Sequence, residues 1–183
     1  ALGFESQGFE TLGFEMDEDC CATYKKNLLG DCVKVKLDAN YKFPKAQVVI
    51  GGPPCQPFSV GGNQMGVMDA RDGFPAFISA VEQAKPDIWI FENVRGLMYK
   101  NKNYLERIIA ALEEEGYIVE YKLLRAVEYG VPQNRERMIV VGHRGNFEFP
   151  IIQTQKITAG DAVGDIAHIV DSKSKFLTPS MDM

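Results

Sequence analysis

Residues 47–59 read QVVIGGPPCQPFS: a short apolar run, then a turn rich in glycine and proline with one cysteine at its centre. The run at 47–50 predicts a buried β-strand, and the glycines and prolines end it. Prolines on both sides of Cys55 stiffen the turn, and a stiff turn directly after a strand can aim a nucleophile. The alternative is a tight turn with an incidental cysteine. We favour the nucleophile, because strained backbone collects at functional sites.

Apolar strands and amphipathic helices alternate on both sides of this turn. The pattern predicts strands at residues 12–15, 47–50, 88–91, 117–124 and 138–141. It predicts helices from Asp17 to Leu29, around 74–84, around 105–112 and, more weakly, at 158–167. Unbroken apolar strands that alternate with helices predict an α/β fold with parallel strands covered on both faces. The segments that begin at Glu15, Asp38, Gly51 and Glu92 then meet at the carboxyl edge of the sheet, where ligands bind.

The composition is that of an ordinary globular protein of about one domain, with 183 residues and a net charge of −5. That charge argues against nonspecific coating of nucleic acid, although residues 95–144 carry more bases than acids. The four cysteines contain no Cys-x-x-Cys pair, so we predict no metal site. They fit a reducing compartment, and no apolar run is long enough to span a membrane.

Cys55 and Glu92 together indicate chemistry on a pyrimidine ring. Acyl transfer by a thiol needs a histidine base, and neither His143 nor His168 lies in a motif for that role. A thiolate can instead add to C6 of a pyrimidine, which requires an acid near the ring nitrogen where negative charge develops. Glu92 closes the predicted strand at 88–91 and would lie at the same sheet edge as Cys55.

Residues 133–137 read QNRER and enter the predicted strand at 138–141. Alternate residues of a strand point to the same side, so Arg135 and Arg137 suit a joint grip on a phosphate and a carbonyl. The alternative is an edge strand with two exposed arginines.

Three motifs in this order resemble the cytosine-C5 DNA methyltransferases of bacterial restriction-modification systems. They are PPCQ at residues 53–56, ENV at 92–94 and Q-x-R-x-R at 133–137. The similarity runs from about residue 3 to residue 142 and includes VGGNQ at 60–64, which resembles the family's mobile loop. The resemblance implies a Rossmann-like doubly wound sheet of the S-adenosylmethionine-dependent methyltransferase type.

The resemblance also implies the catalytic roles. Cys55 would add to C6 of a cytosine in double-stranded DNA, and Glu92 would hold N3 and the exocyclic amine. Arg137 would approach O2 of the base, and Arg135 would support Glu92 or a phosphate. Asn93 would orient the turn that carries Cys55. C5 would then take a methyl group, after the base has left the stack.

The resemblance places S-adenosyl-L-methionine at the other part of the sheet edge. Glu15 would bind the ribose hydroxyls, Met16 would pack on the adenine and Asp38 would bond the adenine amine. Pro54 and Phe74 would line the same pocket.

For the DNA itself, the resemblance implies contacts from Ser59, Arg71 and Gln133. It also implies a bacterial cytoplasmic enzyme with no metal and no membrane partner.

Two features of the family are missing from these 183 residues. The family opens with a strand and a Gly-rich loop, and nothing similar precedes Gly3. The family also carries a target-recognition domain after the arginine pair. We therefore expect residues 1–150 to form an incomplete catalytic domain without its first strand. Residues 151–183 would lead towards a recognition domain supplied by another segment or a complementary subunit.

Two alternatives stay open at this stage. A tRNA cytosine-C5 methyltransferase would carry the same motifs on a different substrate. A catalytically silent remnant could act as a binding module, and the missing Gly-rich loop favours that interpretation. The joint presence of Cys55, Glu92, Arg135 and Arg137 argues against it.

Overall fold

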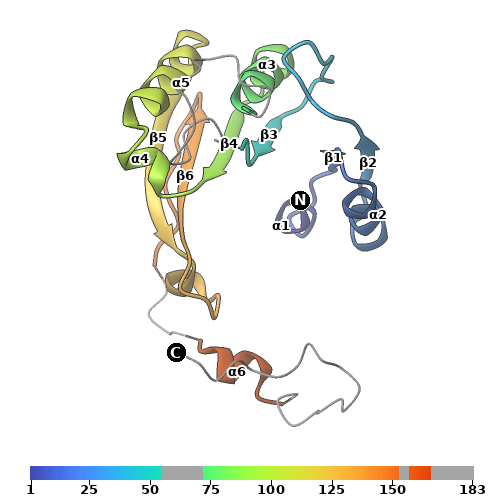
Figure 1. Ribbon diagram of the computed structural model, residues 1–183, viewed down its shortest axis with the longest axis vertical. Helices are drawn as coiled ribbons and strands as arrows, with labels where there is room; N and C mark the ends of the chain where they lie inside the picture. Colours follow the sequence, from blue (N-terminus) through green and yellow to red (C-terminus); the bar gives the residue numbers. More distant parts are fainter. Residues whose placement is uncertain (55–71, 153–156, 166–183) are drawn as a thin grey trace.

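The computed structural model describes residues 1–54, 72–152 and 157–165 (Figure 1). Its larger sheet has the strand order β3-β4-β6-β5. The bounds of these strands are β3 Val48–Gly51, β4 Ile88–Asn93, β5 Ile118–Arg125 and β6 Glu136–His143. A separate sheet pairs β1 (Leu12–Glu15) with β2 (Asp31–Lys34). The predicted α/β class is therefore confirmed.

Most of the helices lie between the strands in the chain. Their bounds are α1 Leu2–Glu5, α2 Glu18–Asn27, α3 Phe74–Ala84, α4 Gly96–Tyr99, α5 Lys102–Glu114, the 3-10 helix η1 Ala126–Tyr129 and α6 Ala159–Val163. Asp17 caps α2 as predicted, because its carboxylate accepts a hydrogen bond from Cys20 N at 2.9 Å. The helix ends at Asn27 rather than Leu29, since Leu28 already has extended backbone. None of the described helices is long and apolar enough to cross a bilayer.

The strand directions confirm the predicted parallel arrangement in part. β1 is parallel to β2, and β3 is parallel to β4. β6 runs antiparallel to both β4 and β5, which the prediction of parallel strands did not include. The reason is the short link between β5 and β6, residues 126–135, which holds only η1. A parallel neighbour needs a crossover of a dozen or more residues.

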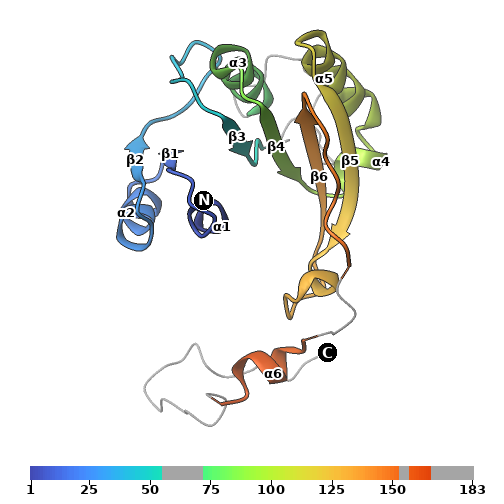
Figure 2. The same cartoon turned by 180° about the vertical axis from the view of Figure 1, so that it is seen from behind.

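The core lies between one face of the larger sheet and the helices α3, α4 and α5 (Figures 1 and 2). On the strands, Trp89 and Phe91 of β4 lie beside Met138 and Val140 of β6, and all four are fully buried. Gly142 makes this packing possible, because a Cβ there would lie 2.0 Å from Cε2 of Trp89. The helices add a further set of buried side chains: Phe74, Phe77, Val81, Leu97, Leu105, Ile108 and Leu112.

The opposite face of the larger sheet is less covered within the described residues. Ile50 of β3 is 45% exposed and Ile118 of β5 is 58% exposed. The prediction that 47–50 forms a buried strand is therefore right about the strand and wrong about the burial of Ile50. Helices were predicted on both faces of the sheet. Within residues 1–54, 72–152 and 157–165, α3, α4 and α5 all pack on the same face of the larger sheet.

Candidate active site

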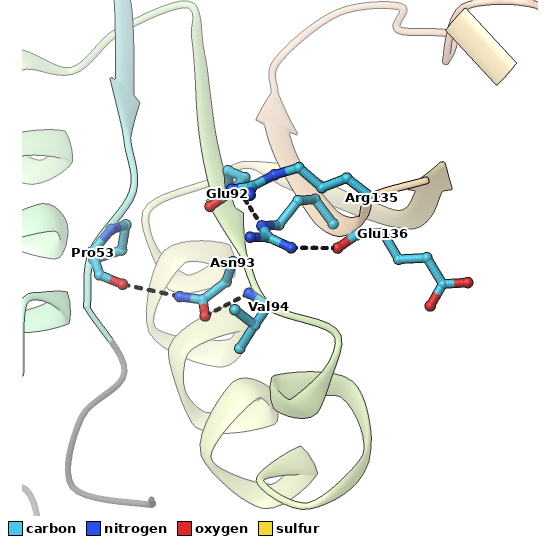
Figure 3. Close-up of polar contacts among 7 residues, drawn as sticks. Pro53, Glu92, Asn93, Val94, Arg135 and Glu136 are labelled. Carbon is cyan, nitrogen blue, oxygen red and sulfur yellow. Dashed lines mark hydrogen bonds and ion pairs between the residues drawn. The ribbon is translucent and has the colours of Figure 1, made fainter. Parts of the chain in front are cut away.

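Glu92 at the end of β4 forms an ion pair with an arginine from β6 (Figure 3). The distance between Arg137 Nε and Glu92 Oε1 is 2.6 Å, while Arg135 Nη2 lies 3.8 Å from the same oxygen. Arg137 is the more buried of the two arginines, and its Nη1 also donates to the backbone oxygen of Glu136 at 2.8 Å. The prediction that alternate arginines face one side is confirmed. Arg137 is the nearer of the two, and Arg135, which was predicted to support Glu92 or a phosphate, also lies within ion-pair distance of Glu92.

Asn93 connects β4 to the turn that follows β3. Its side chain is buried, and Nδ2 donates to the Pro53 oxygen at 2.9 Å while Oδ1 accepts from Val94 N at 2.9 Å (Figure 3). The amide is thus bonded at both ends, which favours a single orientation. Asn93 therefore fixes the backbone two residues before Cys55.

A second contact, from Gly73 before α3, holds the same turn. Gly73 N donates to the Pro54 oxygen at 3.1 Å, and a Cβ on Gly73 would lie 2.4 Å from Cδ of Pro54. Only glycine fits that close approach without a shift. Sequence analysis missed Gly73, although an Asp-Gly pair before a helix is a recognisable sign of a turn. The predicted residues Cys55, Ser59 and Arg71 lie outside the described residues.

The predicted cofactor residues lie at or just after the carboxyl ends of the smaller sheet. Glu15 ends β1, and its Oε1 accepts from Met16 N at 2.8 Å and Asp17 N at 3.0 Å. Within the part of the chain that the structure describes, Oε2 of Glu15 makes no hydrogen bond. Met16 is 66% exposed. Asp38 is also exposed, and its Oδ1 accepts from Asn40 N at 2.8 Å.

The remaining predicted residues have different surroundings. Phe74 is fully buried and packs edge-on against Phe91 at 5.2 Å, so the structure places it in the core. Its place in a cofactor pocket stays a prediction, as does that of Pro54, which is exposed. Gln133 is exposed on the link before β6, close in sequence to Arg135.

One ion pair near the site was missed by sequence analysis. Arg95, which follows the Glu92-Asn93-Val94 motif, lies 3.0 Å from the Glu136 carboxylate and 5.2 Å from the ring centre of Tyr99. The pair joins the segment after β4 to the first residue of β6. Arg95 and Glu136 are 41 residues apart, so no local pattern in the sequence indicates the contact.

No group of three or more histidine, cysteine or acidic side chains in residues 1–54, 72–152 and 157–165 is arranged to hold a metal ion. Cys20, Cys21 and Cys32 are free thiols.

Sequence comparison identifies the family to which this arrangement of motifs belongs. Residues 1–180 match the family of C-5 cytosine-specific DNA methylases. The chain belongs to this family. Among curated members, it is 50% identical to the type II methyltransferase M.AplI of Arthrospira platensis, over 99% of this chain and 53% of that protein. It is 37% identical to M.FnuDI of Fusobacterium nucleatum, over 90% of this chain and 52% of that protein.

The methylase fold is also found among solved structures. A putative DNA modification methyltransferase encoded in an Escherichia coli prophage superposes with a TM-score of 0.64 and 22% identity, over 84% of this chain and 47% of that one. The predicted Rossmann-like methyltransferase fold is therefore confirmed. The chain spans about half the length of the curated methylases quoted above.

Proposed function

We propose that the protein containing this chain transfers a methyl group from S-adenosylmethionine to C5 of a cytosine in double-stranded DNA. The observation that carries the proposal is the ion pair between Glu92 and Arg137, which lies beside a Pro53-Pro54 turn bonded to Asn93. Addition to a pyrimidine requires an acid and a nucleophile. Glu92 is held near the end of one strand, and the bonded Pro53-Pro54 turn after the neighbouring strand directly precedes Cys55 in the sequence.

The proposed reaction begins with a covalent bond between Cys55 Sγ and C6 of the base. The electrons of the C5–C6 double bond move towards N3, where Glu92 donates a proton and its second oxygen accepts from the exocyclic amine. Arg137 keeps the Glu92 carboxyl group in place during this step. C5 then becomes nucleophilic and takes the methyl group. A water molecule or hydroxide then takes the C5 proton, the Cys55 thiolate leaves C6, and the N3 proton returns to the Glu92 carboxylate, which restores the aromatic ring.

The residues at the end of the smaller sheet fit the adenosine part of S-adenosylmethionine, which supplies the electrophilic methyl group when bound. Oε2 of Glu15 makes no hydrogen bond within the described residues and is a suitable acceptor for a ribose hydroxyl. The exposed Met16 side chain offers a flexible apolar surface for an adenine ring. Asp38, also exposed, would accept from the adenine amine.

DNA binding would use the basic side of the site. Arg135 is half-exposed beside Glu92, and Gln133 is exposed on the same link. These two, with Ser59 and Arg71, would contact the backbone of the duplex. These contacts would offset the cost of flipping a base out of the stack, which is about a few kcal/mol.

We also propose how the work is divided along the chain. Residues 1–150 would form the catalytic unit, and residues 151–183 would lead towards a recognition domain on the same or a complementary chain. The curated relatives are about twice as long as the part that this chain matches, which leaves room in them for such a domain.

The test is methyl transfer by the natural protein that contains this chain. Unmethylated genomic DNA and S-adenosylmethionine with a labelled methyl group are the substrates, and 5-methylcytosine is detected by mass spectrometry of the nucleosides. We expect product with the wild type, none with Cys55→Ala and wild-type amounts with Cys20→Ala, which removes an exposed free thiol. The same assay is run with tRNA, and 5-methylcytosine in tRNA but not in DNA would show that tRNA, and not DNA, is the substrate. No product in either would favour a binding module.

A further inference from the structure

The segment between β2 and β3 has no helix or strand of its own, yet it carries Asp38. It is also the only covalent link between the two sheets, and Figures 1 and 2 show it passing beside α3. Where Asp38 and Glu15 lie relative to Glu92 therefore depends on what holds this segment.

Two polar side chains of α3, Ser79 and Gln83, hold the backbone of the segment. Gln83 Oε1 accepts from Phe43 N at 3.2 Å, and its Nε2 donates to the Tyr41 oxygen at 2.9 Å. The same Nε2 donates to Ser79 Oγ at 2.9 Å, and Ser79 Oγ donates to the Ala39 oxygen at 2.8 Å. The two residues are four apart, so the helix places them on one face.

These bonds use nearly all the capacity of both side chains. The Gln83 amide has one acceptor oxygen and two N–H donors, and all three functions are engaged. Ser79 is buried, so its hydroxyl depends on these partners. We name this group the α3 clamp, meaning Ser79, Gln83 and the three backbone groups that they bind.

The clamp is connected to β1 through aromatic side chains. Phe14 of β1 packs edge-on against Tyr41 at 5.5 Å and against Phe43 at 5.8 Å, and these two rings lie 4.9 Å apart. Tyr41 and Phe43 are the residues whose backbone the clamp binds, and Phe14 directly precedes Glu15. A continuous path of contacts therefore runs from α3 to the end of β1.

The clamp reaches Asp38 more directly. One of the two backbone oxygens in the clamp belongs to Ala39, which directly follows Asp38. Asp38 itself closes a turn, because its Oδ1 accepts from Asn40 N and its backbone oxygen accepts from Tyr41 N. Loss of the clamp would free this turn from α3 while leaving Glu92 and its arginines untouched. Loss of the clamp should therefore weaken cofactor binding and leave the catalytic residues around Glu92 unchanged.

We propose that Ser79 and Gln83 are positioning residues for the adenosine end of S-adenosylmethionine. They fix Asp38 and, through Phe14, Glu15 at a set distance from the catalytic edge of the larger sheet. The proposal rests on the function proposed above, because it assumes that Glu15 and Asp38 bind the cofactor.

The test measures cofactor affinity without DNA. In the natural protein that contains this chain, we expect Gln83→Leu to raise the Kd for S-adenosylmethionine about tenfold by calorimetry, the effect of losing a few modest hydrogen bonds. Ser79→Ala should raise it less, and Ser79→Thr, which keeps the hydroxyl, should raise it least. Glu82→Ala, at an exposed position on the same helix, is the matched control and should leave the Kd unchanged.

Turnover separates a positioning role from a purely structural one. With Gln83→Leu, the KM for S-adenosylmethionine should rise with the Kd, while kcat at saturating cofactor and the KM for DNA stay at wild-type values. If Gln83→Leu unfolds at a lower temperature but binds the cofactor as tightly as wild type, the positioning role proposed for the α3 clamp is wrong, while the proposed function stands. A wild type that binds no S-adenosylmethionine would overturn the proposed function and the clamp with it.

Discussion

Arg137 Nε lies 2.6 Å from Glu92 Oε1, so a side chain from β6 holds the carboxyl group at the end of β4. Arg135 lies 3.8 Å from the same oxygen and is more exposed. The antiparallel pairing of β4 with β6 brings these residues together, because it sets Glu92 opposite Ile139, two residues from Arg137. The direction of β6 is thus a condition for this site.

We predict unequal effects of removing the two arginines. Arg137→Ala should lower kcat/KM for DNA methylation about 100-fold, because Glu92 loses its close partner while negative charge develops on the base. Arg135→Ala should lower it about tenfold or less, since its contact is longer and more exposed. Steady-state kinetics measures both, with Arg107→Ala, an exposed position on α5, as the control. Equal losses for the two arginines would contradict the role given to Arg137.

The Asn93 amide should contribute to stability as well as to the site. Asn93→Ala leaves the buried Pro53 oxygen and the partly buried Val94 N without their partner, which costs about 1–3 kcal/mol of unfolding free energy. Urea unfolding gives the value. Val94→Ala alters an exposed neighbouring side chain and keeps the backbone N–H, so it should cost less than about 0.5 kcal/mol. A neutral Asn93→Ala would show that the turn before Cys55 is held without this bond.

Gly142 should be intolerant of any side chain. A Cβ at this position would lie 2.0 Å from Trp89, which is fully buried and cannot move without disturbing the core. Gly142→Ala should cost about 1–3 kcal/mol or more, as overpacked cores do. Gly145→Ala is the matched control, because its Cβ would meet no atom within 4 Å. Equal unfolding temperatures for the two variants would contradict the packing described here.

The Glu5 carboxylate makes the stability of the N-terminal part depend on pH. Hydrogen bonds from the Thr11 hydroxyl, and from Leu29 N and Gly30 N, lower the pKa of Glu5 below its usual value of 4.5. A carboxyl group with a lowered pKa in the folded state stabilises the fold above about pH 4.5, and this contribution is lost as the pH falls through the folded-state value. Glu5→Gln should therefore be less stable than wild type at pH 7, with a difference that shrinks at acid pH. Unfolding at both pH values measures this, and a constant difference would contradict it.

Much of the site follows from local sequence patterns. The apolar run before Glu92 and the glycine–proline turn before Cys55 predict two strand ends at one edge, and the spacing of Arg135 and Arg137 predicts one shared side. The contact of Asn93 with Pro53 agrees with the orienting role that the family resemblance implied.

Other features depend on contacts between distant residues, which leave no periodic trace. Ser79 binds Ala39, and Gln83 binds Phe43, across 40 residues in each case. The exposure of Ile50 was not predictable either, because an apolar run indicates a strand but not which of its faces is covered. The close approach of Gly73 to Pro54 depends on the start of α3, which the sequence places only to within a few residues.

The covalent bond between Cys55 and cytosine is the central claim, and a trapped complex tests it most directly. Double-stranded DNA that carries 5-fluorocytosine at all cytosines is incubated with the natural protein and saturating S-adenosylmethionine, and denaturing electrophoresis separates free from bound DNA. Fluorine at C5 blocks the proton loss that precedes release, so we predict a stable protein–DNA complex with the wild type and with Cys20→Ala. Cys55→Ala should give none. A complex that persists in Cys55→Ala, or a wild type that methylates ordinary DNA yet traps none, would contradict the account.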